Sequence, residues 1–193
     1  MNSEPVTSIL NRIKGSERSR IDAVFAKATD FEIVTAAHSA IEEHYGFETI
    51  LKRDPRVPYH RWVAHTVTAN TGFFETNGYS YFWGTSCDHK GFAESLRVIG
   101  RPILATVVEE AIVMVPESLL GDWDAVDDFF GDEDERILAA ETLDAKLITE
   151  DPDITGKTSK YIRLHRYSYS DLLDAIDKSI DEWRAQSSEY ERE

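Results

Sequence analysis

Apolar residues recur at three- and four-residue spacing in most long segments of the chain, which is the period of an amphipathic helix. The pattern predicts the all-α fold class, with a single compact multi-helix domain over residues 1–193. The family-like core described below and a C-terminal helix lie within this domain. The expected helices cover residues 6–13, 21–28, 31–45, 62–70, 89–100, 102–115, 119–130, 132–148 and about 169–186.

Glycine, proline and cap residues mark the boundaries of these helices. We expect Asp30 to cap the third helix and Gly46 to end it, Gly100 to close the fifth, and Pro102 to occupy the first turn of the next. The stretch EDPDITGKTSK (residues 150–160) is predicted to be a loop from its Pro, Gly and Thr content. The stretch KYIRLHRYSY that follows fits either a helix or a strand, and Ser168 or Ser170 is expected to cap the final helix.

Length and composition are those of one ordinary globular domain. The 193 residues are 41% hydrophobic, and no apolar run approaches the roughly 20 residues that a transmembrane helix needs. The first residues do not have the pattern of a secretory signal, and Cys87 is the only cysteine. These features predict a cytoplasmic protein without a membrane partner.

The net charge of −15 is concentrated in one part of the chain. Residues 109–153 hold sixteen acidic residues but only Arg136 and Lys146 as basic ones, a net charge of −14. Direct nucleic-acid binding is disfavoured, because a phosphate-binding face needs a basic stripe. The asymmetry predicts a basic partner instead.

The acidic residues are interleaved with large apolar ones in the stretch VPESLLGDWDAVDDFFGDEDER (residues 115–136). A disordered acidic tail would lack Trp123, Phe129 and Phe130, because it has nothing to bury. We therefore predict a folded acidic surface that binds the partner. The predicted partner-binding residues are Asp122, Asp124, Asp127, Asp128, Asp132, Glu133, Asp134 and Glu135.

Catalytic and metal-binding motifs are not apparent. A calcium loop starting at Asp122 would need glycine at its sixth position, where Asp127 stands. Cys87 and His89 are two residues apart, a poor spacing for a nucleophile and its base, and are expected to be structural. The histidines, which show neither zinc-protease nor di-iron spacing, are His38, His44, His60, His65, His89 and His165. We therefore expect no catalytic residue, metal or cofactor, although a carboxylate-based hydrolase or metal enzyme stays open as an alternative.

The stretch ETNGYSYFWGTS (residues 75–86), followed by FAESLRVIGRPILATVVEEAIVMVP, resembles the DNA-mimic protein family. In that family an Asn-Gly-Gly-Phe motif leads into a short aromatic run, and a helix ending in Ile-Gly follows. The resemblance covers residues of about 60–165 and includes LDAKL (residues 143–147) as a later element. In the Asn-Gly-Gly-Phe motif, this chain has one glycine where the family usually has two. The motif positions here are Asn77, Gly78, Tyr79, Phe82 and Trp83.

The resemblance implies an all-α protein without catalytic activity, which in at least some members is a homodimer. Its acidic surface would compete with DNA for a basic DNA-binding protein such as a transcription factor. An alternative is an immunity-type inhibitor of a basic nuclease toxin, which would need the same surface. The motif residues are expected to be structural, with Gly78 in a turn of positive φ and the aromatic residues in the core.

Overall fold

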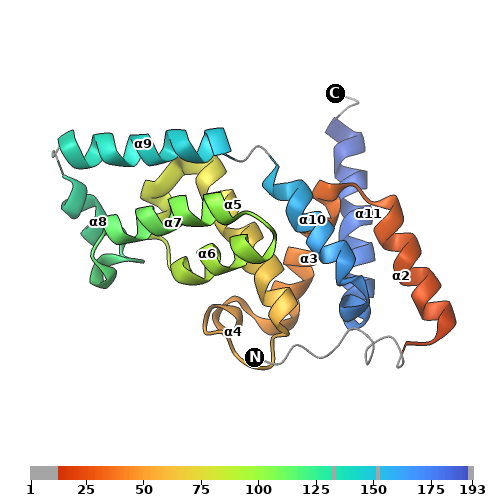
Figure 1. Ribbon diagram of the computed structural model, residues 1–193. Coiled ribbons are helices and arrows are strands. Elements are labelled where there is room, and N and C mark those ends of the chain that lie inside the picture. The colour runs from red at the N-terminus through yellow and green to blue at the C-terminus, as the bar shows by residue number, and fades with distance from the viewer. Residues whose placement is uncertain (1–12, 132–133, 151–152, 191–193) are drawn as a thin grey trace. The chain divides into compact units, whose positions relative to one another are not determined.

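The computed structural model describes residues 13–131, 134–150 and 153–190, apart from the side chains of 73–78, 80–81, 134, 147–150 and 189–190. The described residues form helices and no strand, which confirms the predicted all-α fold class (Figure 1). None of the described helices combines the length and the apolar character needed to cross a membrane. Contacts divide the helices into two compact units, Met1–His65 with Thr155–Glu193, and Thr66–Ile154.

The first unit is built around the packing of α3 (Asp30–Tyr45) against α11 (Leu173–Tyr190). The apolar face of α3 buries Ile33, Ala37 and Ile41, spaced four residues apart, and α11 contributes Ile176 and Ile180. The helices of this unit are α2 (Gly15–Lys27), α3 (Asp30–Tyr45), α4 (Phe47–Leu51), the start of α5 (Tyr59–Gly84), α10 (Ile154–Leu164), the 3₁₀ helix η2 (Arg166–Leu172) and α11 (Leu173–Tyr190).

A capping box at Thr29, not the predicted cap at Asp30, begins α3. The Thr29 hydroxyl accepts a hydrogen bond from the Glu32 amide at 3.2 Å, and the Glu32 carboxylate accepts one from the Thr29 amide at 2.7 Å. Asp30 is instead the first helical residue. Gly46 ends the helix with φ of 78°, as predicted.

The predicted loop over residues 150–160 is wrong from Ile154 onward, where α10 begins. This helix is held by tertiary contacts, because Thr158, Ser159 and Ile162 are fully buried. The Ser159 hydroxyl donates to Asp30 Oδ1 at 2.7 Å, and Arg163 donates to the Ala28 carbonyl at 2.7 Å. These bonds connect α10 to residues at the start of α3, whereas the loop was predicted from Pro, Gly and Thr content alone.

The ambiguous stretch KYIRLHRYSY is helical, not a strand, since it forms the end of α10 and the start of η2. The chain passes from η2 directly into α11 at Leu173, so no cap by Ser168 or Ser170 starts the last helix. Arg61 fixes this region to α5 and α3. Its buried guanidinium donates to Tyr45 Oη at 2.7 Å, to the Ser168 carbonyl at 3.0 Å and to Asp171 Oδ2 at 3.0 Å.

The second unit packs α6 against α7 and α7 against α9. Gly100, with φ of 85°, follows α6, and Pro102 begins α7, both as predicted. The helices of this unit are the remainder of α5, α6 (His89–Val98), α7 (Pro102–Met114), the 3₁₀ helix η1 (Glu117–Leu119), α8 (Trp123–Phe130) and α9 (Asp134–Glu150).

The aromatic residues of the predicted motif lie in the core of the second unit. Tyr79, Phe82 and Trp83 are each 0% exposed, which confirms their predicted burial. Their spacing of three and four residues places them on one face of α5. The expected turn at Gly78 is wrong, because α5 continues through Asn77 and Gly78 to Gly84. A helical Gly78 has no need of positive φ.

Candidate functional site

The amphipathic helix α8 accounts for the mixture of aromatic and acidic residues in its sequence. Asp122 caps it, since its carboxylate accepts a hydrogen bond from the Ala125 amide at 3.1 Å. Val126 is buried, and Phe130 stacks on Trp83 of α5 with ring centroids 4.8 Å apart. The apolar side of α8 therefore anchors the helix and leaves the acidic side to solvent.

Trp123 adds a second anchor at the end of α5. A Cβ atom placed on Gly84 would lie only 2.6 Å from the Trp123 ring, so the ring packs directly on the glycine backbone. At the other end of α8, Gly131 adopts φ of 45°, and the Arg136 guanidinium lies 4.2 Å from the centre of the Phe129 ring. Both ends of α8 are fixed by contacts made within the second unit.

The carboxylates of Asp124, Asp127 and Asp128 form the exposed side of α8, which we call the acidic face. Their spacing of three and four residues places them together on the helix. Within the described part of the chain none of the three forms an ion pair. Asp122 and Glu135 are also exposed. Of the other predicted partner-binding residues, Asp132 and Glu133 lie outside the described residues, and Asp134 begins α9 with a side chain that is not described.

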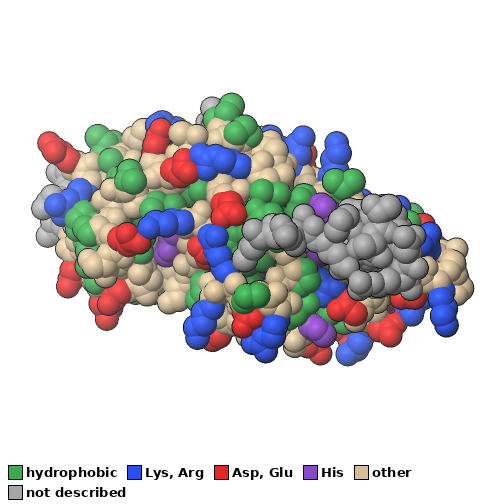
Figure 2. All heavy atoms as spheres, turned by 60° about the horizontal axis from the view of Figure 1, so that its bottom comes forward, with side chains coloured by type: hydrophobic (Ala, Val, Ile, Leu, Met, Phe, Trp, Pro, Cys, Tyr) green, Lys and Arg blue, Asp and Glu red, His purple; other side chains and the backbone are tan. Residues whose placement is uncertain are grey.

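Other carboxylates of the acidic segment are neutralised locally, as shown by the ion pairs Glu109–Arg97 at 2.6 Å, Glu117–Lys90 at 2.6 Å and Glu110–Lys146 at 3.0 Å. Figure 2 shows acidic and basic side chains interspersed over the face that it draws. Asp144 is half-buried and accepts a hydrogen bond from the Tyr79 amide at 3.0 Å; burial raises its pKa. The acidic face differs from these carboxylates in forming no ion pair among the described residues.

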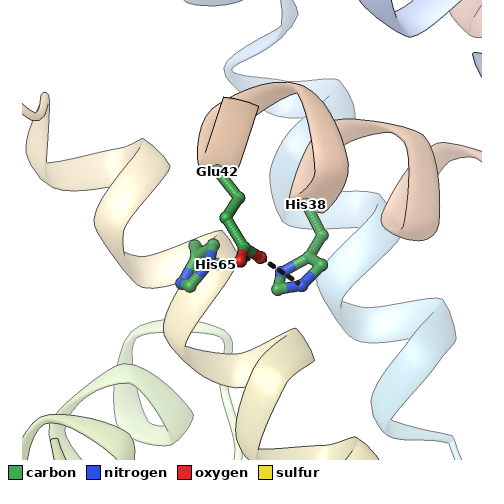
Figure 3. A group of neighbouring side chains, drawn as sticks. All are labelled: His38, Glu42 and His65. Atoms are coloured by element: carbon green, nitrogen blue, oxygen red, sulfur yellow. Dashed lines mark ion pairs between the residues drawn. The ribbon is translucent and has the colours of Figure 1, made fainter. Parts of the chain in front are cut away.

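A second cluster lies in the first unit, where His38 and Glu42 of α3 and His65 of α5 point toward one another (Figure 3). His38 and Glu42 share one side of α3 because they are four residues apart. Glu42 Oε2 lies 3.3 Å from His38 Nε2 and 3.6 Å from His65 Nε2. The two imidazole rings stack with centroids 4.4 Å apart.

Both imidazoles of this cluster are neutral at pH 7. Burial, together with the neighbouring His38, lowers the pKa of His65 to about 3. Burial also lowers the pKa of His38, against the opposing effect of the Glu42 carboxylate. His65 Nε2 and His38 Nδ1 are buried without a hydrogen-bond partner. Two imidazole rings and a carboxylate therefore converge, and two of the ring nitrogens lack a hydrogen-bond partner.

The sequence reveals only two of the three residues of this cluster. His38 and Glu42 are four residues apart, a spacing that matches neither the paired histidines of a zinc protease nor the Glu-x-x-His of a di-iron protein. His65 joins the other two residues only through the packing of α5 on α3, which no local pattern reveals.

Cys87 and His89 do not form a nucleophile and its base. Burial raises the pKa of the Cys87 thiol, with Asp88 adding to the effect, so the thiol stays protonated. His89 is a buried core residue whose Nε2 lies 2.8 Å from the Phe82 carbonyl oxygen. This geometry agrees with the structural role expected for both.

No protein-family model, curated protein or solved structure matches the chain. Function is therefore inferred from the acidic face and the histidine cluster themselves.

Proposed function

We propose that the protein is a non-enzymatic acidic binding module that imitates the charge of DNA and occupies the DNA-binding face of a basic protein, such as a transcription factor. The observation that carries the proposal is the acidic face of α8, with exposed Asp124, Asp127 and Asp128 lacking an ion pair among the described residues. It lies in a segment whose net charge is −14.

Helix stability does not explain all of these carboxylates. A negative charge stabilises the N-terminal turn of a helix, where Asp122 and Asp124 lie, and destabilises the C-terminal turn by about 0.3–1 kcal/mol. Asp127 and Asp128 occupy the last turn of α8, which contains no basic residue. Contact with a basic partner supplies the favourable interaction that these two residues lack within the fold.

The charge density of the acidic face is comparable with that of DNA. Asp124 and Asp128 are separated by about 6 Å along the helix axis, at a rise of about 1.5 Å per residue. Three carboxylates over this length compare with one phosphate charge per about 1.7 Å of duplex axis. A protein surface that binds phosphates through Lys and Arg could therefore bind this face in the same way.

The test is capture of basic proteins in competition with duplex DNA. The immobilised chain is exposed to the heparin-binding protein fraction of its own source cells and is then washed with increasing salt or with duplex DNA. We expect a basic protein to be retained, to be released by DNA, and to bind more weakly as salt shortens the Debye length to about 8 Å. A released protein that cleaves DNA would assign the immunity alternative.

The variant for this test is Asp127→Asn with Asp128→Asn, and its matched control is Glu43→Gln with Asp181→Asn. The control removes the same charge from exposed positions of the first unit. We expect the first variant to lose retention and the control to keep it. The proposal would be contradicted if duplex DNA did not release the captured protein. It would also be contradicted if the two variants captured the protein equally well.

A further inference from the structure

We propose that His38, Glu42 and His65 form a three-ligand site for a divalent transition metal, and that zinc fits it best. The site lies in the first unit and does not depend on the acidic face of the second. It adds metal binding to a chain whose sequence shows no metal motif.

The donor set is the first argument. Two imidazole nitrogens and one carboxylate oxygen are a set that binds zinc with a fourth position left for water. Calcium and magnesium prefer sites made wholly of oxygen ligands, which this cluster does not offer. The convergence of His38, Glu42 and His65 is the one group of this kind among the described residues.

The spacing of the donor atoms is the second argument. Ligand atoms about 2.0–2.1 Å from a tetrahedral zinc ion lie about 3.4 Å from one another. The distances from Glu42 Oε2, 3.3 Å to His38 Nε2 and 3.6 Å to His65 Nε2, match this value. All three ligand atoms lie within 4.8 Å of one another, and the two stacked imidazole rings, 24° apart in orientation, must turn toward a common point for both nitrogens to bind one ion.

The third argument is the burial of one of the three donors. The His65 side chain is 4% exposed, and its Nε2 faces Glu42 without a hydrogen-bond partner. Leaving a buried polar atom unsatisfied costs about 1–3 kcal/mol. A bound metal ion would satisfy this nitrogen.

A path to solvent exists on the other side of the site. The side chains of Glu42 and His38 are 44% and 24% exposed, whereas His65 closes the inner side. A metal ion can therefore enter beside Glu42, and a water molecule can complete its coordination there.

The test is titration of the metal-free full chain with Co²⁺, followed by visible absorption, and with Zn²⁺, followed by calorimetry. We expect one ion per chain and the d–d bands of four-coordinate Co²⁺. Glu42→Gln, which keeps size at a half-exposed position, should weaken the affinity for Zn²⁺ about 100-fold. Circular dichroism of this variant should remain that of the parent chain.

The chain offers a matched control in a second stacked pair of histidines, His60 and His165, with ring centroids 5.4 Å apart. This pair belongs to no three-ligand group among the described residues. His165→Gln should therefore bind Zn²⁺ as the parent does. Absence of stoichiometric binding by the parent, or equal affinities of the parent and Glu42→Gln, would overturn the proposal.

Discussion

At the scale of single residues, His60 shows what a buried imidazole contributes to the first unit. It stacks on His165 and meets the Tyr169 ring edge-on, and its Nε2 is buried without a hydrogen-bond partner. Burial lowers the pKa of His60 to about 3, with His165 and Arg61 acting in the same direction and Asp171 opposing them. The folded chain therefore holds His60 neutral at a pH where an unfolded chain would protonate it.

This difference predicts a loss of stability in mild acid. An unfolded histidine titrates near pH 6.5, so between about pH 6.5 and 3 the unfolded state binds a proton at His60 that the folded state lacks. The contribution of neutral His60 is complete above pH 6.5 and falls by about 1.4 kcal/mol per pH unit below it. In urea unfolding between pH 6 and 4.5, His60→Phe should reduce the pH slope by about that amount.

The lower limit of pH 4.5 for this comparison is chosen to avoid the titration of two shifted carboxylates. The pKa values of Glu32, beside Arg184, and of Asp54, beside Arg56, are lowered to about 2, so they lose stabilising charge mainly below pH 4.5. Ser187→Ala, at an exposed position, removes no titratable group, so it provides the control and should leave the slope unchanged. Equal slopes for the parent chain and His60→Phe would contradict the prediction.

At the scale of helices, the position of α8 depends on how closely Trp123 can approach the end of α5. The ring packs on the backbone of Gly84, and Phe130 stacks on the neighbouring Trp83. Any side chain at position 84 occupies the space of the ring. The position of α8, which carries the acidic face, therefore requires glycine at position 84.

Gly84→Ala should destabilise the second unit, because its methyl group would lie 2.6 Å from the Trp123 ring. Such overpacking typically costs about 1–3 kcal/mol. Gly72→Ala, in the same helix, places its Cβ where no atom lies within 4 Å and should stabilise the chain by about 0.5–1 kcal/mol. Denaturant unfolding measures the free energy of unfolding of both variants. If both lost stability, the loss in Gly84→Ala could not be assigned to contact with the Trp123 ring.

Local signals predicted the helix boundaries marked by glycine and proline, because those residues act through their own backbone. Gly46 and Pro102 lie where the sequence placed them. The start of α10 was missed because Gly156 and Thr158 favour a loop, whereas the helix is held by distant contacts such as that of Ser159 with Asp30, 129 residues away in the chain. Propensity alone cannot include a partner so distant in sequence.

The same distinction holds for the candidate sites. The acidic face could be predicted, since Asp124, Asp127 and Asp128 alternate with apolar residues at helical spacing. The histidine cluster could not, because His65 reaches His38 only through the packing of two helices. A pattern within one helix is readable from sequence, whereas a site between helices is not.

At the scale of the whole molecule, charge is distributed unevenly between the two units. The segment with a net charge of −14 ends at residue 153, and the second unit ends at Ile154. Ion pairs such as Arg97–Glu109 compensate part of this charge, whereas the acidic face of α8 forms no ion pair among the described residues. Repulsion among uncompensated carboxylates opposes folding and is reduced by salt.

Stability should therefore rise with ionic strength. Increasing the salt from about 0.01 M to 1 M shortens the Debye length from about 30 Å to 3 Å. The variant Asp127→Asn with Asp128→Asn should be more stable than the parent by about 1 kcal/mol at low salt, because both charges oppose the dipole of α8, and should gain less from added salt. The control pair Glu43→Gln with Asp181→Asn should not gain stability at low salt, because Asp181 helps to raise the pKa of Arg184 and is therefore a favourable charge. If the Asp127 and Asp128 variant were instead less stable than the parent at low salt, the two carboxylates would be stabilising the fold, and the reason to assign them to a partner would be lost.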